Sequence, residues 1–268
     1  MYSEHELTEL HNELLYLLKQ FHKFCVKNDI KYSIHGGTLL GAVREKGFIP
    51  WDDDADVTMT RVEYEKFYTA VQSANIGEEF SFMVVDRAPR FVMKREGKPA
   101  VCIDIIIYDY ISENVLSQKC KIYGIMFLGG MMKTKESMVI TKERGTYSKW
   151  KYGMYYLAYL LGRLFSEDLK LCWFERFSKN CFCGKKKLIH RSNDQYIGII
   201  IVLPAEIMSR YEAIQFEDTE LMASSNYHEI LLSSYGEDYM TPKRYADNEL
   251  EVHTKFRKML EKGENQGD

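Results

Sequence analysis

The sequence predicts an α+β fold, in which a β-sheet flanked by helices is followed by a mainly helical extension. Leucine and other apolar residues recur at helical spacing through 4–28, which indicates an amphipathic helix. Short β-type runs follow at 80–86, 90–95 and 101–108. Beyond residue 112 the pattern turns mainly helical, with helices expected at 151–165, 168–182, 226–235 and 247–262 and short β or irregular runs from 192 onward. We therefore expect a core over 1–112 and a helical extension over 113–268 packed onto it.

The composition is that of an ordinary globular protein. The chain has 268 residues, 46% of them hydrophobic, and a net charge of −3, which gives no reason to expect nucleic-acid binding. Residues 1–12 are polar and acidic, so we expect no signal peptide, and no apolar run is long enough to cross a bilayer. The six cysteines fit no disulfide framework, so we expect reduced thiols and a cytoplasmic protein.

The first two elements have clear start signals. Ser3 with Glu6 forms a capping-box pattern, which predicts where the helix at 4–28 begins. Apolar residues alternate at 30–34, which predicts a short strand after this helix. This strand leads into the stretch that carries most of the candidate site.

A glycine pair opens that stretch. Gly36 and Gly37 have no side chains, so their backbone N–H groups can approach a ligand closely. Thr38 is placed to cap a short helix at 39–44, and the partial positive charge at the start of a helix suits a phosphate. Arg44, at the end of this helix, either clamps a phosphate or pairs with a nearby aspartate.

An acidic cluster follows the glycine corner. It consists of four carboxylates in five positions, Asp52, Asp53, Asp54 and Asp56. Their mutual repulsion is most simply relieved by a divalent cation. Residues 54–59 can form a strand with Asp54 and Asp56 on one face, while the other face packs. A phosphate corner and a metal-binding cluster in one stretch indicate phosphoryl chemistry.

Asp104 is the candidate for a third ligand. It stands alone among Val, Ile and Cys in the run 101–108, and a carboxylate in a buried strand needs a partner or a metal. We interpret it as a ligand that a neighbouring strand brings to Asp54 and Asp56.

The turn at 96–99 joins the runs on either side of it into a predicted hairpin. In this hairpin Lys94 and Arg95 are expected opposite Asp104, with only one of them facing the site. Lys94 is the candidate for contacting a phosphate, and a plain surface charge is the alternative.

A calcium-binding loop of the EF-hand type is a competing interpretation of the acidic cluster. Asp52, Asp54, Asp56 and Glu63 fall at its ligand positions, but Val57 stands where that loop needs glycine. We therefore favour the strand interpretation.

The aromatic helix expected at 151–165 raises a separate possibility. Together with Lys185–Lys187 it could make peripheral contact with a membrane surface, although a core or groove-lining helix is the favoured interpretation.

Residues 35–57, HGGTLLGAVREKGFIPWDDDADV, resemble the signature of the LicD family, which comprises phosphocholine transferases and the related fukutin-type ribitol-phosphate transferases. Shorter blocks that resemble the family are VCIDIIIYD at 101–109, FED at 216–218 and YGEDYMTP at 235–242. Two features depart from the family pattern. Many members carry histidine where this chain has Glu45, and glycine more often follows the acidic residue of the FED block.

The resemblance implies a nucleotidyltransferase-like mixed β-sheet flanked by helices, with the catalytic core at 1–112. Gly36 and Gly37 match the phosphate corner, and Thr38 and Arg44 are expected to help hold donor phosphate. In the family pattern, three positions bind Mg²⁺, for which Mn²⁺ could substitute. These positions are matched here by Asp54, Asp56 and Asp104.

The implied reaction moves phosphocholine from CDP-choline to a hydroxyl of a cell-surface glycan and releases CMP. Lipopolysaccharide, teichoic acid or a lipid-linked glycan precursor would be the acceptor, in the cytoplasm or at the inner face of the membrane. Asp53 is expected to accept the proton of the hydroxyl. The alternatives are a nucleotidyltransferase that moves a nucleoside monophosphate to a small molecule or protein, and a non-catalytic binding protein with the same fold.

Overall fold

The computed structural model describes residues 3–242 except 75, 86, 98, 136 and 140–148. The chain divides into two compact units. The first runs from the N-terminus to Met83, continues over Pro89–Tyr108 and resumes at Glu206, and the second consists of Val84–Ala88 and Asp109–Ala205. The boundary expected after residue 112 lies close to the change of unit at Asp109. The return of the chain to the first unit at Glu206 was not expected.

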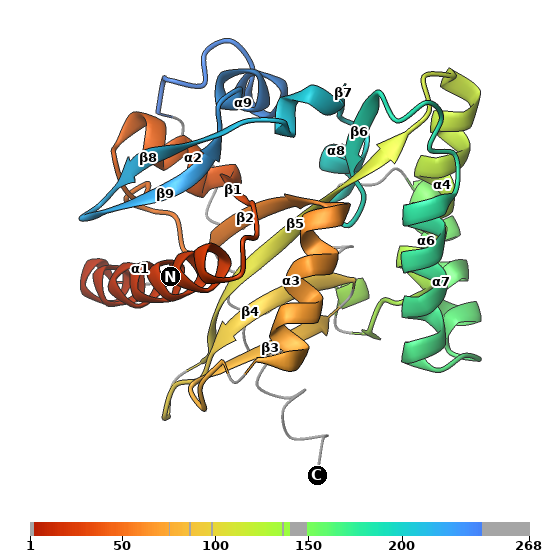
Figure 1. The fold of residues 1–268 in the computed structure, drawn as a ribbon. Helices are drawn as coiled ribbons and strands as arrows, with labels where there is room; N and C mark the ends of the chain where they lie inside the picture. Colours follow the sequence, from red (N-terminus) through yellow and green to blue (C-terminus); the bar gives the residue numbers. More distant parts are fainter. Residues whose placement is uncertain are drawn as a thin grey trace. The chain divides into compact units, whose positions relative to one another are not determined.

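The first unit is built on a mixed sheet with the strand order β1-β2-β5-β4-β3 (Figure 1). The strands are β1 (Ser33–His35), β2 (Ala55–Thr60), β3 (Phe80–Val85), β4 (Ala88–Met93) and β5 (Val101–Ile111). β2 and β5 run parallel, whereas β1 is antiparallel to β2 and β4 is antiparallel to β5. The α+β class and the hairpin before β5 are thus confirmed. Several strand ends differ from expectation. β1 begins at Ser33, β4 begins at Ala88 and ends at Met93, and β5 extends to Ile111.

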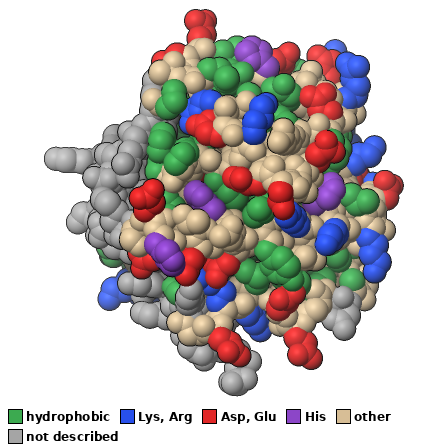
Figure 2. All heavy atoms as spheres, turned by 90° about the vertical axis from the view of Figure 1, so that its left-hand side faces the viewer, with side chains coloured by type: hydrophobic (Ala, Val, Ile, Leu, Met, Phe, Trp, Pro, Cys, Tyr) green, Lys and Arg blue, Asp and Glu red, His purple; other side chains and the backbone are tan. Residues whose placement is uncertain are grey.

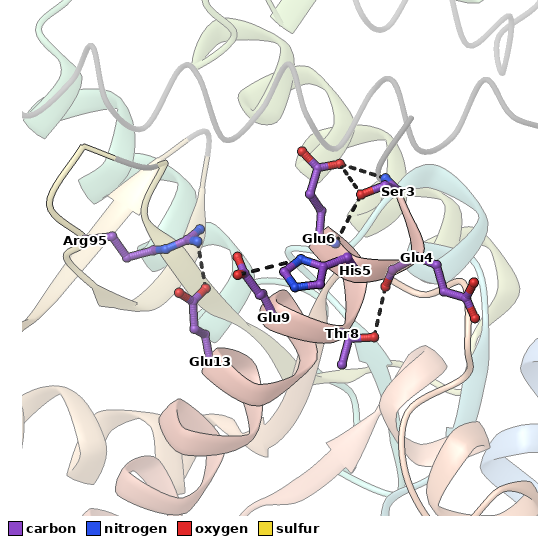
Figure 3. A network of polar contacts seen from close by, with 8 residues as sticks. All are labelled: Ser3, Glu4, His5, Glu6, Thr8, Glu9, Glu13 and Arg95. Carbon is purple, nitrogen blue, oxygen red and sulfur yellow. Dashed lines mark hydrogen bonds and ion pairs between the residues drawn. The ribbon is translucent and has the colours of Figure 1, made fainter.

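Helices and a second small sheet complete the described part of the first unit. They are α1 (Glu4–Lys27), α2 (Gly36–Arg44), α3 (Arg61–Ser73), the 3-10 turn η1 (Ala205–Met208), the hairpin of β8 (Tyr211–Phe216) and β9 (Thr219–Ser224), and α9 (Tyr227–Tyr235). The predicted capping box is confirmed at the start of α1 (Figure 3). The Ser3 hydroxyl accepts from the Glu6 N–H at 3.2 Å, and the Glu6 carboxylate accepts from the Ser3 N–H at 2.7 Å.

An aromatic cluster packs α1 and α3 against one face of the sheet. The rings of Phe21 on α1 and Phe67 on α3 have centroids 5.4 Å apart, and Phe91 on β4 lies 5.7 Å from Phe21. All three side chains are buried. From Val101 to Ile107 the residues of β5 alternate between buried and half-buried, so the face opposite the aromatic cluster stays partly open there. This open face carries the candidate site.

The second unit consists of helices and short strands. Its described elements are α4 (Val115–Met131), α6 (Lys149–Gly162), α7 (Glu167–Asn180), β6 (Leu188–Arg191), α8 (Tyr196–Ile199) and β7 (Val202–Pro204). β6 pairs with β7 and with β5, whose last residues from Asp109 on belong to this unit. Ile125 of α4, Phe174 of α7 and Ile199 of α8 form its apolar core.

The expected helices at 151–165 and 168–182 are confirmed as α6 and α7, and the helix expected near 226–235 is confirmed as α9. The described part of the extension is mainly helical, as expected, and also contains the short strands β6 to β9. The charged helix expected at 247–262 lies outside the described residues. Within the described ranges, no helix combines the length and the hydropathy needed to cross a bilayer. All six cysteines are thiols.

Figure 2 views the face on which α1 and the β8–β9 hairpin lie in Figure 1. Acidic and basic side chains are interspersed on this face, with histidine and apolar side chains between them. Charges of both signs therefore stand side by side over this part of the first unit.

Candidate active site

Four polar residues form one row across the open face of the sheet. His35 of β1 is in register with Asp56 of β2, Asp56 with Asp104 of β5, and Asp104 with Arg90 of β4. Neighbouring strands lie about 5 Å apart, and residues in register project to the same side. The four-strand row (His35, Asp56, Asp104, Arg90) thus brings together the two aspartates that the sequence placed on neighbouring strands.

The acidic cluster divides into two sets by burial. Asp52, Asp54 and Asp56 are half-buried, while Asp53 is 2% exposed and alternates with them. The two-residue period of an extended chain explains this division. Asp52 was not among the predicted site residues, although the spacing of Asp54 and Asp56 extends back to it.

The glycine pair lies directly against two of these carboxylates. A Cβ atom on Gly36 would stand 2.6 Å from Oδ2 of Asp56, and one on Gly37 would stand 2.1 Å from Oδ2 of Asp52. Gly36 also has a positive φ of 56°. A side chain at either position would displace a carboxylate of the acidic cluster, and the positive φ at Gly36 independently favours glycine there.

Thr38 does not cap the helix as predicted. α2 begins at Gly36, two residues earlier, because the glycine pair forms its first turn. The Thr38 side chain is buried, and its hydroxyl accepts from the Asp56 N–H at 2.9 Å. Thr38 therefore fixes the start of α2 to the strand that carries Asp56.

Arg90, which the sequence did not indicate, is the basic partner of Asp104. Its Nε donates to Oδ1 at 2.7 Å, and its Nη2 donates to Oδ2 at 3.2 Å. The Arg90 side chain is 8% exposed and the Asp104 side chain 33% exposed. The Arg90–Asp104 ion pair is therefore bidentate, and the Arg90 side chain is almost fully buried.

The predicted placement of Lys94 and Arg95 opposite Asp104 is wrong. β4 ends before Lys94, and Met93 pairs with Val101, so the residue opposite Asp104 is four positions earlier than Lys94. Arg95 points to α1 instead, where its Nη2 lies 2.8 Å from Oε2 of Glu13 (Figure 3).

Arg44 is paired, but not with the acidic cluster. Its Nε donates to both carboxylate oxygens of Glu45, at 2.7 and 2.9 Å, and Nη1 donates to the Tyr239 carbonyl at 3.4 Å. Tyr239 belongs to the block at 235–242, so this block closes over the end of α2. The Arg44 Nε is thus bound by Glu45, the position that departs from the family pattern.

The FED block anchors the loop between α2 and the acidic cluster. The Glu217 carboxylate accepts from the Phe48 N–H at 2.9 Å, and the Glu217 N–H donates to the Lys46 carbonyl at 2.7 Å. Phe216 packs edge-on against Phe48, with ring centroids 4.8 Å apart. The block therefore holds the loop that leads to the acidic cluster.

The site offers a divalent metal the right kind of donor. Asp54, Asp56 and Asp104 supply carboxylate oxygens, which are the ligands that Mg²⁺ prefers. Among the described residues, however, no three His, Cys, Asp or Glu side chains surround a common point. The Asp104 carboxylate is turned to Arg90 and the Asp56 carboxylate to Gly36, so these side chains would have to turn toward a metal.

Comparison with known proteins supports the resemblance seen in the sequence. The family described as "LicD/FKTN/FKRP, nucleotidyltransferase domain" matches residues 29–124, the range that contains the glycine pair, the acidic cluster and Asp104. The chain is 28% identical over 249 residues to lipopolysaccharide cholinephosphotransferase LicD from Haemophilus influenzae, which covers 84% of this chain and 88% of that protein. An uncharacterized protein from Rickettsia prowazekii is 57% identical over 44 residues, 16% of each chain.

The family match therefore falls on the elements that form the four-strand row, and the similarity to the Haemophilus protein extends along most of the chain. Over residues 29–124 this chain is thus similar to the LicD family, and over most of its length to one cholinephosphotransferase of that name.

Proposed function

We propose that this protein is a LicD-type transferase that moves phosphocholine from CDP-choline to a hydroxyl of a cell-surface glycan or its lipid-linked precursor. The similarity to a lipopolysaccharide cholinephosphotransferase supports a phosphotransferase that acts on a glycan of this kind. The observation that carries the proposal is the register of Asp56 with Asp104, beside the glycine pair at the start of α2.

In the proposed reaction, the oxygen of the acceptor hydroxyl attacks the phosphorus of the phosphocholine group. The P–O bond to CMP breaks, and CMP leaves with the bonding electrons. The backbone N–H groups of Gly36 and Gly37 lie at the positive end of α2 and would bind oxygens of the donor phosphates. Both glycines are half-buried and so remain accessible to a ligand.

We assign a Mg²⁺ site, which Mn²⁺ could also fill, to Asp54, Asp56 and Asp104. A metal bound there would neutralise negative charge on the diphosphate as the bond to CMP breaks. Arg90 would orient the Asp104 carboxylate through its two hydrogen bonds. Thr38 would fix the backbone of Asp56 relative to the glycine pair.

The proton of the acceptor hydroxyl needs a carboxylate within reach. Asp53, the residue expected for this role, is buried, whereas Asp52 is half-buried on the same side as Asp54 and Asp56. This exposure favours Asp52 over Asp53 as the proton acceptor. Asp52 also lies against Gly37, at the corner where donor phosphate would bind.

Product analysis tests the proposed function. Wild-type protein is incubated with Mg²⁺, a lipopolysaccharide acceptor, and CDP-choline, CTP or ATP in turn. We expect CMP in solution and choline on the acceptor, from CDP-choline only. Nucleoside monophosphate attached to the acceptor would instead show the nucleotidyltransferase that the family description also allows. Binding of CDP-choline without any turnover would show a non-catalytic binding protein.

A further inference from the structure

The outer side of α6 in the second unit is an exposed apolar face. Trp150 is 63% exposed, Leu157 58% and Leu164, just beyond the helix, 75%. Met154 and Leu161 are also exposed and complete a series of residues three or four positions apart. This spacing places Trp150, Met154, Leu157 and Leu161 on one side of α6, and Leu164 follows in the turn directly after the helix. We call this surface the α6 face (Trp150, Met154, Leu157, Leu161, Leu164).

The opposite side of α6 already packs within its own unit. Tyr155, Ala158 and Tyr159 are buried, and Tyr155 and Tyr159 belong to one apolar cluster with Met126 of α4. α4, α6 and α7 run alongside one another in Figure 1, and α4 contacts both of the other helices. α6 is therefore apolar on two sides, and only one of them is covered by its neighbour. Large apolar surfaces of this kind mark an interaction site.

The sequence of α6 and of the turn after it carries charge of one sign. From Lys149 to Phe165 it contains three basic residues, Lys149, Lys151 and Arg163, and no aspartate or glutamate, and Glu167 and Asp168 follow at the start of α7. This differs from the face in Figure 2, where both signs are interspersed. Basic residues beside leucine, tryptophan and tyrosine are the composition that binds anionic lipid surfaces.

We propose that the α6 face docks on the surface of an anionic lipid bilayer. With 14 residues α6 is too short to span the hydrocarbon core, so it would lie in the plane of the interface. Its leucines and Met154 would enter the acyl boundary, Trp150 would lie at the level of the head groups, and Arg163 would contact lipid phosphates.

A second copy of this chain fits the α6 face less well. Two α6 helices packed face to face would bring the basic residues of one copy close to those of the other, because the segment offers no acidic partner. An anionic bilayer offers an acyl region to the apolar side chains of the α6 face and negative head groups to the basic residues of the segment. The proposal does not depend on the proposed reaction, and its test needs no enzyme assay.

The test is sedimentation of the full chain with vesicles of phosphatidylcholine alone or mixed with phosphatidylglycerol. We expect binding to the anionic vesicles only, with weakening at high salt. The double variant Trp150→Ser/Leu157→Ser should bind at least about tenfold more weakly, because it removes two large apolar side chains from the interface. The matched control Val26→Ser/Val62→Ser changes two exposed apolar residues of the first unit and should bind like wild type.

A second readout locates the contact. Tryptophan emission should shift to the blue on addition of anionic vesicles, and Trp150→Phe should lose most of this shift while still sedimenting with the vesicles. The proposal is overturned if wild type ignores anionic vesicles, or if the double variant binds as well as wild type. It is also overturned if the double variant abolishes a dimer of the wild type instead, since a second copy would then cover the face.

Discussion

Arg90 holds Asp104 through two hydrogen bonds, Nε to Oδ1 at 2.7 Å and Nη2 to Oδ2 at 3.2 Å, across the antiparallel pair β4–β5. The same aspartate is in register with Asp56 on its other side. Asp104 therefore stands between a fixed positive charge and a second carboxylate. This position makes Arg90 a positioning residue for the proposed metal site.

Two substitutions of Arg90 test the role of its positive charge and the role of its two hydrogen bonds separately. Arg90→Met leaves Asp104 without its partner and should lower the free energy of unfolding by about 1–3 kcal/mol. Arg90→Lys keeps the charge but loses the two-pronged contact, so it should cost less stability while still lowering the rate of CMP release. Urea unfolding and the assay with CDP-choline measure the two effects. Wild-type stability and turnover in Arg90→Met would show that the ion pair has neither role.

Alanine at the glycine pair should disrupt the site more than the fold. Gly36→Ala places a Cβ 2.6 Å from Oδ2 of Asp56, at a φ of 56°. We expect a loss of turnover of at least about tenfold, together with about 1–2 kcal/mol of backbone strain. Gly97→Ala is the matched control, because its φ is 66° and a Cβ there would meet no described atom within 4 Å. Equal loss of turnover in Gly36→Ala and Gly97→Ala would mean that backbone strain alone lowers turnover and that the glycine pair has no specific role in the site.

The FED block should affect turnover indirectly, because Glu217 holds the loop between α2 and the acidic cluster in place. Glu217→Ala removes the acceptor of the Phe48 N–H and should lower the free energy of unfolding by about 1–2 kcal/mol. Hydrogen exchange of the Phe48 amide should become faster, and turnover should fall because the loop leads to the acidic cluster. Glu217→Gln keeps an acceptor oxygen and should stay closer to wild type. Unchanged exchange at Phe48 in Glu217→Ala would contradict this role.

The second unit should lose stability in mild acid through His190. Burial, and secondly the charge of Lys121, lowers the pKa of His190 from 6.5 to about 4. The unfolded chain therefore binds this proton first, so stability is full above pH 6.5 and falls as the pH drops toward 4. The expected loss is up to about 3 kcal/mol. His190→Gln should lack this part of the pH dependence, and the exposed His5→Gln should retain it.

Chemical denaturation across that pH range compares the three proteins. The informative quantity is the difference in the free energy of unfolding between wild type and His190→Gln at each pH. A difference that does not change with pH would mean that His190 has the same pKa in the folded and the unfolded chain, which would contradict the prediction.

The sequence predicted the features that depend on local pattern. The Ser3–Glu6 capping box lies within one turn of helix, and the alternation around Asp56 and Asp104 identifies the face of each strand. Arg90 could not be found in this way, because its place opposite Asp104 depends on where the hairpin turns. We expected Lys94 there instead.

Tertiary contacts account for the other differences. Thr38 has a good capping side chain, but the glycine pair starts the helix earlier and the hydroxyl binds the Asp56 backbone. Glu217 lies 169 residues from Phe48 in the sequence, so its role in the loop is invisible without the fold. The return of the chain to the first unit after Ala205 also depends on contacts between residues far apart in the sequence, which no local pattern reveals.

The most direct test of the account measures Mn²⁺ binding and CMP release together in Asp56→Asn, with Asp29→Asn as the control. Asp29 is exposed and has a positive φ of 50°, a backbone conformation that asparagine adopts readily. Electron paramagnetic resonance reports bound Mn²⁺, and circular dichroism confirms folding. We predict that Asp56→Asn loses both metal binding and CMP release, whereas Asp29→Asn keeps both. A folded Asp56→Asn protein that binds Mn²⁺ and releases CMP like wild type would contradict the account.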